Sequence, residues 1–202
     1  MCWNASVSLN TFIFGLVCAL YIGLFTKYDK KLLLIALSIS LMQLLEYFAW
    51  TNINNKKIIN ILSYIGLFII FLQVFLINYI LTSGTFRIKM LSIMILLIIL
   101  FLIIEFKNVN FSMKKGQNGH LIWYWLDIPI IWIFITFAFY LIPLYYSIYR
   151  ISFYYAFISI IISLHFYFKY KTWGTMWCYM SNIIWIYITF KAIFKLLINY
   201  YK

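Results

Sequence analysis

The sequence predicts an all-α protein built as a bundle of seven transmembrane helices. Of its 202 residues, 66% are hydrophobic, only 10% are charged, and the mean hydropathy is +0.98. A soluble domain of ordinary composition carries about 25% charged residues. Because water is a poor solvent for so apolar a chain, we expect an integral, multi-pass membrane protein in which residues 1–202 form a single helical domain.

The predicted spans are apolar runs of the length that a helix needs to cross the hydrocarbon of a bilayer, roughly 17 to 25 residues. They cover residues 9–25, 32–50, 58–81, 90–106, 128–148, 151–168 and 175–198. The weakest boundary is Tyr149-Arg150, where a very short turn must separate the fifth and sixth helices. If that break fails, the prediction falls to six helices.

Most of the predicted connections are short and polar, which is typical of antiparallel neighbouring helices. The exception is the longer segment from Lys107 to Asp127. Asp127 stands two residues before Pro129, and an acidic residue followed by proline is typical of a helix start. We therefore expect Asp127 to cap the fifth helix.

The formal net charge is +12, but the lysines and arginines are scattered between apolar runs, as at the ends of membrane spans. The expected partner is thus a lipid bilayer and not nucleic acid. The uncharged first segment precedes a loop with Lys27, Lys30 and Lys31, which predicts an N-terminus outside and a C-terminus inside. Which membrane holds the protein is not indicated by the sequence.

Two helices show patterns that indicate their packing. The fourth span is almost wholly aliphatic and phenylalanine, which predicts a peripheral helix facing lipid. In the first helix, Gly15, Ala19 and Gly23 recur at four-residue intervals. Such small residues allow two helix backbones to approach closely, so they predict a packing seam.

Glu46 is the most informative single residue because it lies inside the second span, where an ionisable group costs at least a few kcal/mol. It belongs to a stripe of polar and amphipathic residues at helical spacing, which should face the bundle. The members of this stripe are Ser40, Gln43, Glu46, Tyr47 and Trp50. The alternative is that Glu46, only about one turn from the end of the span, extends into interfacial water.

The seventh helix carries a second polar stripe, and we expect the two stripes to meet inside the bundle. Its members are Cys178, Ser181, Asn182, Trp185 and Thr189. The prediction is a ligand-binding pocket formed by Gln43, Glu46, Cys178 and Asn182, which takes a small polar molecule, an ion or a lipid headgroup. The sequence does not decide whether the protein is an enzyme.

A metal centre is the alternative, because alternation of the spans puts several ligand types on one membrane side. The candidates are His120, His165, Glu46 and Cys178. Zinc held by these residues would make the protein a metal-dependent, membrane-embedded lipid hydrolase. No HxxxH or CxxC spacing supports this, and each histidine fits an interfacial position equally well. The same side gathers Trp3, Trp50, Trp123, Trp125, Trp173 and Trp177, as expected of an aromatic belt.

Short motifs along the chain also suggest a family. They are Met1-Cys2-Trp3-Asn4-Ala5-Ser6, the segment 43–50, the segment 119–123 and Trp177-Cys178. The chain resembles uncharacterised multi-pass membrane proteins of bacteria and large DNA viruses that open with Met-Cys-Phe/Trp-Ser-Ala, although Asn4 replaces the usual serine. The resemblance implies a bacterial or viral membrane protein without an assigned reaction, and it singles out Cys2, Glu46 and Trp177-Cys178. A structural or assembly role in a membrane is a further alternative.

Overall fold

A computed structural model describes residues 4–25 and 31–200, without the side chains of residues 25, 184–186, 188, 191, 192 and 195–200. The described residues form seven α-helices. They are α1 (Ala5–Phe25), α2 (Leu32–Thr51), α3 (Lys56–Leu81), α4 (Gly84–Ile104), α5 (Ile130–Tyr146), α6 (Arg150–Tyr167) and α7 (Trp173–Tyr200). Most of these bounds agree with the predicted spans to within a few residues. The exception is α4, which begins at Gly84 and not near residue 90.

The break between the fifth and sixth helices is present, so the two predicted segments form separate helices. Helix α5 ends at Tyr146 and α6 begins at Arg150. The Ser147 hydroxyl donates to the Leu144 carbonyl at 2.8 Å and accepts from the Tyr149 amide at 3.0 Å. These bonds satisfy backbone groups that a helix end would otherwise leave without a partner, and they allow a very short turn.

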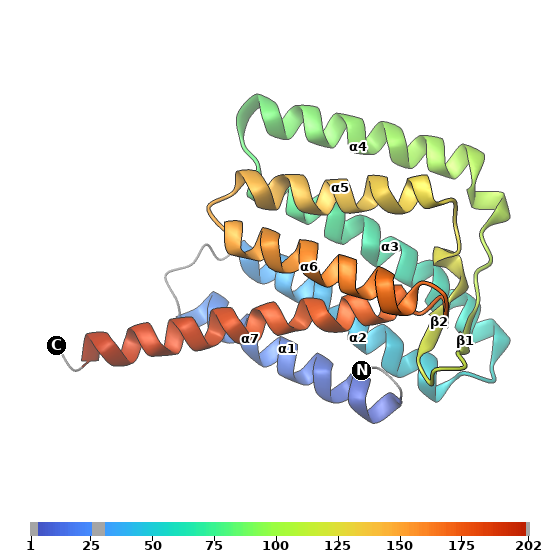
Figure 1. The fold of residues 1–202 in the computed structure, drawn as a ribbon, viewed down its shortest axis with the longest axis horizontal. Coiled ribbons are helices and arrows are strands. Elements are labelled where there is room, and N and C mark those ends of the chain that lie inside the picture. The colour runs from blue at the N-terminus through green and yellow to red at the C-terminus, as the bar shows by residue number, and fades with distance from the viewer. Residues whose placement is uncertain (1–3, 26–30, 201–202) are drawn as a thin grey trace.

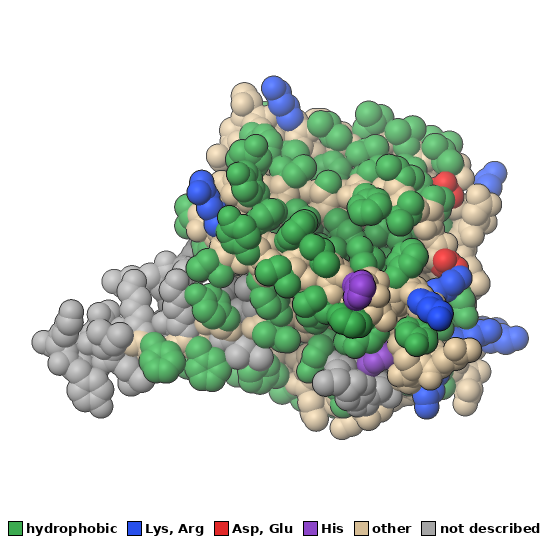
Figure 2. Space-filling view, in the orientation of Figure 1, with side chains coloured by type: hydrophobic (Ala, Val, Ile, Leu, Met, Phe, Trp, Pro, Cys, Tyr) green, Lys and Arg blue, Asp and Glu red, His purple; other side chains and the backbone are tan. Residues whose placement is uncertain are grey.

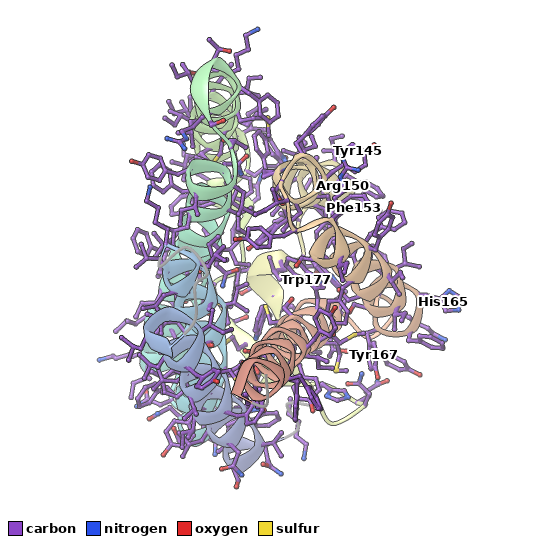
Figure 3. The ribbon with its side chains drawn as sticks, turned by 90° about the vertical axis from the view of Figure 1, so that its left-hand side faces the viewer. Tyr145, Arg150, Phe153, His165, Tyr167 and Trp177 are labelled. Carbon is purple, nitrogen blue, oxygen red and sulfur yellow. The ribbon has the colours of Figure 1, made fainter. Side chains whose placement is uncertain are left out.

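The helices form two rows that run along one another (Figure 1). Helices α1 to α4 make one row and α5 to α7 make the other, as the end-on view in Figure 3 shows. The rows meet where α7 packs against α1 and α2, and where α5 packs against α3. Trp177 of α7 lies in the middle of the bundle, between the two rows.

Five of the described helices, α1, α2, α3, α4 and α6, are long and apolar enough to cross a membrane, and α5 is apolar but shorter. The outward faces are apolar as well. Figure 2 shows hydrophobic side chains across the middle of one face and basic side chains toward its margins. The predicted peripheral position of the fourth helix is confirmed, because α4 buries only Met90, Met94 and Phe101. The architecture is that expected of an integral membrane protein.

Polar side chains lie in the interior and join the two rows. Gln73 of α3 donates to the Ser38 carbonyl of α2 at 2.9 Å and accepts a hydrogen bond from the Tyr140 hydroxyl of α5 at 2.5 Å. The Asn78 amide donates to the Phe139 carbonyl at 2.9 Å. Such bonds between membrane helices contribute about 0.6 kcal/mol each. They hold α3 at the centre of the fold.

The all-α class is confirmed, but the long connection is not a simple loop. It contains an antiparallel hairpin of β1 (Met113–Lys115) and β2 (Leu121–Trp123), flanked by the 3₁₀ turns η1 (Phe106–Asn108) and η2 (Tyr124–Leu126). Trp125 is fully buried against Gly66 of α3. The Thr175 hydroxyl of α7 donates to the Leu121 carbonyl at 2.7 Å. The hairpin therefore closes one end of the bundle.

This inserted hairpin corrects the aromatic-belt prediction. Trp123, Trp125, Trp173 and Trp177 are buried, and Trp123 stacks on Trp125 with ring centroids 5.1 Å apart. Trp50 is partly buried, and Trp3 lies outside the described residues. The connection folds back into the bundle, and its indoles pack in the core and do not anchor in lipid headgroups.

The predicted helix cap at Asp127 is also wrong. The N-cap position of α5 is Pro129, and the Asp127 carboxylate lies 2.5 Å from the Lys171 ammonium. This hydrogen bond raises the pKa of Lys171. Asp127 therefore links the end of the hairpin segment to the turn before α7, a tertiary contact that the local sequence does not show.

The contact between Gly66 and Trp125 leads to a prediction about stability. A β-carbon on Gly66 would lie 2.7 Å from the indole ring, whereas one on Gly23 meets the flexible end of Leu33 at 3.0 Å. We expect Gly66→Ala to lower the free energy of unfolding by about 1–3 kcal/mol through overpacking. Gly23→Ala, the control, should change it much less. Thermal unfolding in detergent measures both, and equal effects would contradict the proposed packing.

Candidate functional site

The two polar residues at the centre of the predicted site are removed from solvent. Glu46 and Gln43 of α2 are both fully buried, with 0% exposure. The side chain of Glu46 therefore does not extend into interfacial water. It lies in the half of α2 nearest the hairpin, about one turn from the helix end at Thr51. Tyr47 and Trp50, on the same stripe, are only partly buried.

Helix α7 contributes the second half of the site. Cys178 and Asn182 are each 3% exposed, whereas Ser181 and Thr189 are partly buried. Trp185, the remaining member of the predicted stripe, has no described side chain. The Asn182 amide donates to the Cys178 carbonyl at 2.9 Å, and this orients its Oδ1 away from that carbonyl. Among the described residues, Asn182 Oδ1 has no hydrogen-bond partner.

Gly15 of α1 is where the two stripes come together. A β-carbon built there would lie 2.6 Å from the Ser40 hydroxyl oxygen and 2.8 Å from Asn182 Oδ1. Ser40 and Asn182 thus meet over the bare face of this glycine. The predicted small-residue seam packs α1 against α2 and, at Gly15, also leaves space for the polar side chains of two other helices.

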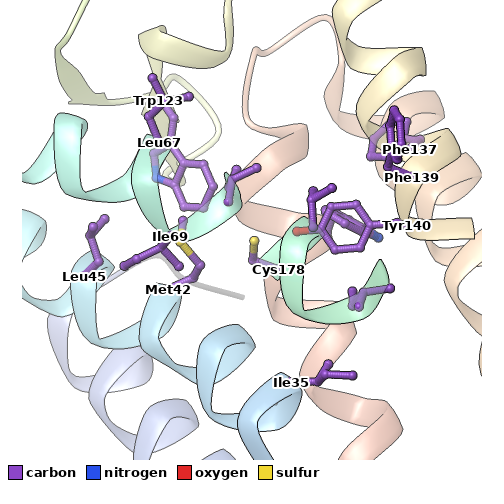
Figure 4. Close-up of a cluster of buried hydrophobic side chains, with 14 of the residues drawn as sticks. Ile35, Met42, Leu45, Leu67, Ile69, Trp123, Phe137, Phe139, Tyr140 and Cys178 are labelled. Carbon is purple, nitrogen blue, oxygen red and sulfur yellow. The ribbon is translucent and has the colours of Figure 1, made fainter. Parts of the chain in front are cut away.

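Glu46 and Cys178 are close enough to interact electrostatically, as are Cys178 and Tyr140. The Tyr140 ring in turn packs edge-on against Trp177, with centroids 4.8 Å apart. Figure 4 shows Cys178 inside the buried cluster, with Met42 and Tyr140 on either side of it in that view. Cys178 therefore interacts both with Glu46 and with Tyr140 in the buried core.

Two cavities lie between the rows of helices. The larger, about 90 Å³, is bounded by α2, α3, α5, α6 and α7, and the smaller, about 50 Å³, lies toward the hairpin. Trp177 and Cys178 line both cavities, whereas Gln43, Glu46 and Asn182 line neither. Of the four predicted site residues, Cys178 therefore borders both cavities, and the other three are buried outside their linings. We call these four residues the Glu46 cluster.

The metal-ligand candidates are only partly brought together. His120 is buried in the turn of the hairpin, edge-on to Tyr167 with centroids 5.6 Å apart, whereas His165 is exposed and points away from the bundle (Figure 3). Within the described ranges, no three side chains of His, Cys, Asp or Glu are grouped so that they could hold a metal ion. Cys2 lies outside those ranges.

Sequence reasoning missed two residues that border the cluster, Gln73 and Tyr140, and it singled out Trp177 only through the family resemblance. All three are buried between the rows and line the larger cavity. Gln73 had a usable signal, because an amide inside a long apolar span is costly unless it is hydrogen-bonded. Tyr140 had none, since tyrosine is also common at the membrane interface of such helices.

Comparison of the chain with models of protein families, with curated proteins and with solved structures finds no match. The resemblance to uncharacterised bacterial and viral membrane proteins therefore stays a prediction. The class that the structure supports is a helical protein with five helices long and apolar enough to span a membrane.

The convergence at Gly15 can be tested by stability measurements. We expect Gly15→Ala to destabilise the protein by about 1–3 kcal/mol, because the new methyl group collides with two polar side chains. Ser40→Ala removes one of these side chains, so the double variant should recover part of the loss, with a coupling of about 0.5 kcal/mol or more. If the loss of stability in the double variant equals the sum of the losses in the two single variants, Gly15 and Ser40 do not meet.

The burial of His120 predicts a pH dependence. Burial lowers its pKa from the ordinary value of 6.5, so the unfolded chain binds this proton more readily than the folded one. Stability should therefore fall as the pH drops below about 6.5 toward the lower pKa of the folded state. His120→Gln should flatten this part of the unfolding curve measured against pH. His165→Gln, at an exposed position, is the matched control and should leave the slope due to His120 in place.

Proposed function

We propose that the protein is a multi-pass integral membrane protein with seven membrane-crossing helices. Helix α5 has 17 residues, at the short end of the crossing range of roughly 17 to 25. Helix α7 has 28 residues and packs against α1 and α2. We therefore count both as spans, in addition to the five helices α1, α2, α3, α4 and α6. An N-terminus outside and a C-terminus inside remain our prediction for its orientation.

Within this bundle, we propose that the cluster of Gln43, Glu46, Cys178 and Asn182 binds a proton or a small cation. The observation that carries the proposal is the complete burial of Glu46 of α2, which lies close enough to Cys178 of α7 to interact with it electrostatically. A carboxylate in so apolar a surrounding attracts a positive charge strongly, since the local dielectric is low. Asn182 Oδ1, with no partner among the described residues, adds an oxygen that a cation can use.

Transport is the activity that such a site supports best. An intramembrane carboxylate facing the bundle interior is the usual mark of an ion or proton pathway. The hydrolase alternative receives less support, because His165 lies on the outside of α6, away from Glu46 and Cys178. A purely structural role would not explain why a carboxylate is kept in the interior at a cost of a few kcal/mol.

The test compares Glu46→Gln with the wild-type protein in liposomes, with uptake of protons, Na⁺ and K⁺ measured under an imposed gradient. Glutamine keeps the size of the side chain and removes its charge, so the fold should be retained. We expect uptake of the transported ion to fall by about tenfold or more, which corresponds to about 1.4 kcal/mol. Thermal unfolding of both proteins checks that the variant is folded.

Glu105→Gln is the matched control. Glu105 follows α4 outside the buried cluster, and its carboxylate contacts the Trp132 indole nitrogen at 3.4 Å. The same chemical change at this position should leave ion uptake unaltered. Equal uptake by the wild type and Glu46→Gln would rule out Glu46 as the ion-binding group.

A further inference from the structure

The larger cavity is distinct from the Glu46 cluster, and its lining is chiefly apolar. It extends from Trp177 and Cys178 in the interior to Leu32, Leu81 and Tyr149 at the end of the bundle away from the hairpin. Three hydroxyl groups in its wall donate to backbone carbonyls of their own helix or of a neighbour, and the Tyr140 hydroxyl donates to the Gln73 side chain. The bonds to carbonyls are Tyr155 to Met180 at 2.6 Å, Ser159 to Ala156 at 2.8 Å and Ser181 to Trp177 at 2.9 Å.

The shape of the cavity suits a chain and not a compact polar molecule. Along α6 it is bordered from Tyr149 to Ser159, a distance of about 15 Å at 1.5 Å per residue. Its volume of about 90 Å³ exceeds the roughly 10–15 Å³ that one water needs, but the lining offers few free polar partners for water. In a bilayer, the apolar chains available to fill such a space are those of lipids.

The open end of the cavity is bordered by basic residues. Lys31 directly precedes the lining residue Leu32, and Arg150 directly follows Tyr149. Arg87 is held beside Leu81 by hydrogen bonds from its guanidinium to the Thr82 carbonyl, at 2.8 and 2.5 Å. Lys31 precedes α2, Arg87 lies in the first turn of α4, and Arg150 begins α6. All three are thus at the end of the bundle away from the hairpin.

The described carboxylates lie away from this end of the cavity. Within the described ranges the acidic residues are Glu46, Glu105 and Asp127, and all three lie toward the hairpin end. The cavity mouth is thus positively charged in this part of the chain. Basic side chains near an anionic membrane surface attract acidic lipids.

We propose that this cavity binds one anionic phospholipid from the surrounding bilayer. One acyl chain lies between α2, α3, α5, α6 and α7 and reaches toward Trp177. The headgroup phosphate sits at the mouth, near Lys31, Arg87 and Arg150. The site does not depend on ion binding at Glu46, so Glu46→Gln should bind the lipid as the wild type does.

The test is native mass spectrometry of the detergent-purified protein after addition of phosphatidylglycerol or of phosphatidylcholine with the same acyl chains. We expect the wild type to retain one phosphatidylglycerol under conditions that remove phosphatidylcholine. Ala156→Phe places a ring in the cavity and should lower retention by about tenfold. Ile158→Phe, on the exposed side of the same helix, is the control and should retain the lipid.

Two further variants complete the design. Ser152→Phe fills the cavity from a second position near its mouth and replaces Ala156→Phe if that variant does not fold. Arg150→Gln should reduce the preference for phosphatidylglycerol over phosphatidylcholine. Equal retention of the two lipids by the wild type would overturn the headgroup assignment. Wild-type retention by a folded cavity-filling variant would overturn the chain-binding site.

Discussion

The fold depends on one constraint, which is that hydrocarbon cannot hydrogen-bond to polar groups. Polar side chains on the membrane-length helices therefore turn inward and meet one another or a backbone carbonyl. Gln73 does this between α2 and α5, and Asn78 does so toward α5. Gln43, Glu46 and Asn182 are buried for the same reason. The protein thus keeps an apolar exterior around a partly polar interior.

The hairpin adds a second level of organisation at one end of the bundle. Its indoles replace the side chains that a simple seven-helix bundle would need to close the space between its two rows. Trp125 packs on Gly66, and the Thr175 hydroxyl donates a hydrogen bond to Leu121 of strand β2. Because the beginning of α7 is tied to this hairpin, the positions of Cys178 and Asn182 depend on a segment far from them in sequence.

The Glu46 cluster and the larger cavity are separated by Trp177 and Cys178. Cys178 interacts electrostatically with Glu46 and also lines the cavity, so it is the one residue that both sites share. A bound lipid chain would pack against the same segment of α7 that supports the polar cluster.

The sequence by itself determined the helical class, the approximate bounds of the helices and the inward-facing stripes of α2 and α7. These properties are local, because the length and period of apolar runs follow from single-helix geometry. It did not show the hairpin, the burial of the four tryptophans, the ion pair between Asp127 and Lys171, or the separation of His165 from the site. Those features depend on contacts between residues far apart in the chain. Only the tertiary structure decided them, since the hairpin's packing energy comes from surfaces on α3 and α7 that its own sequence does not contain.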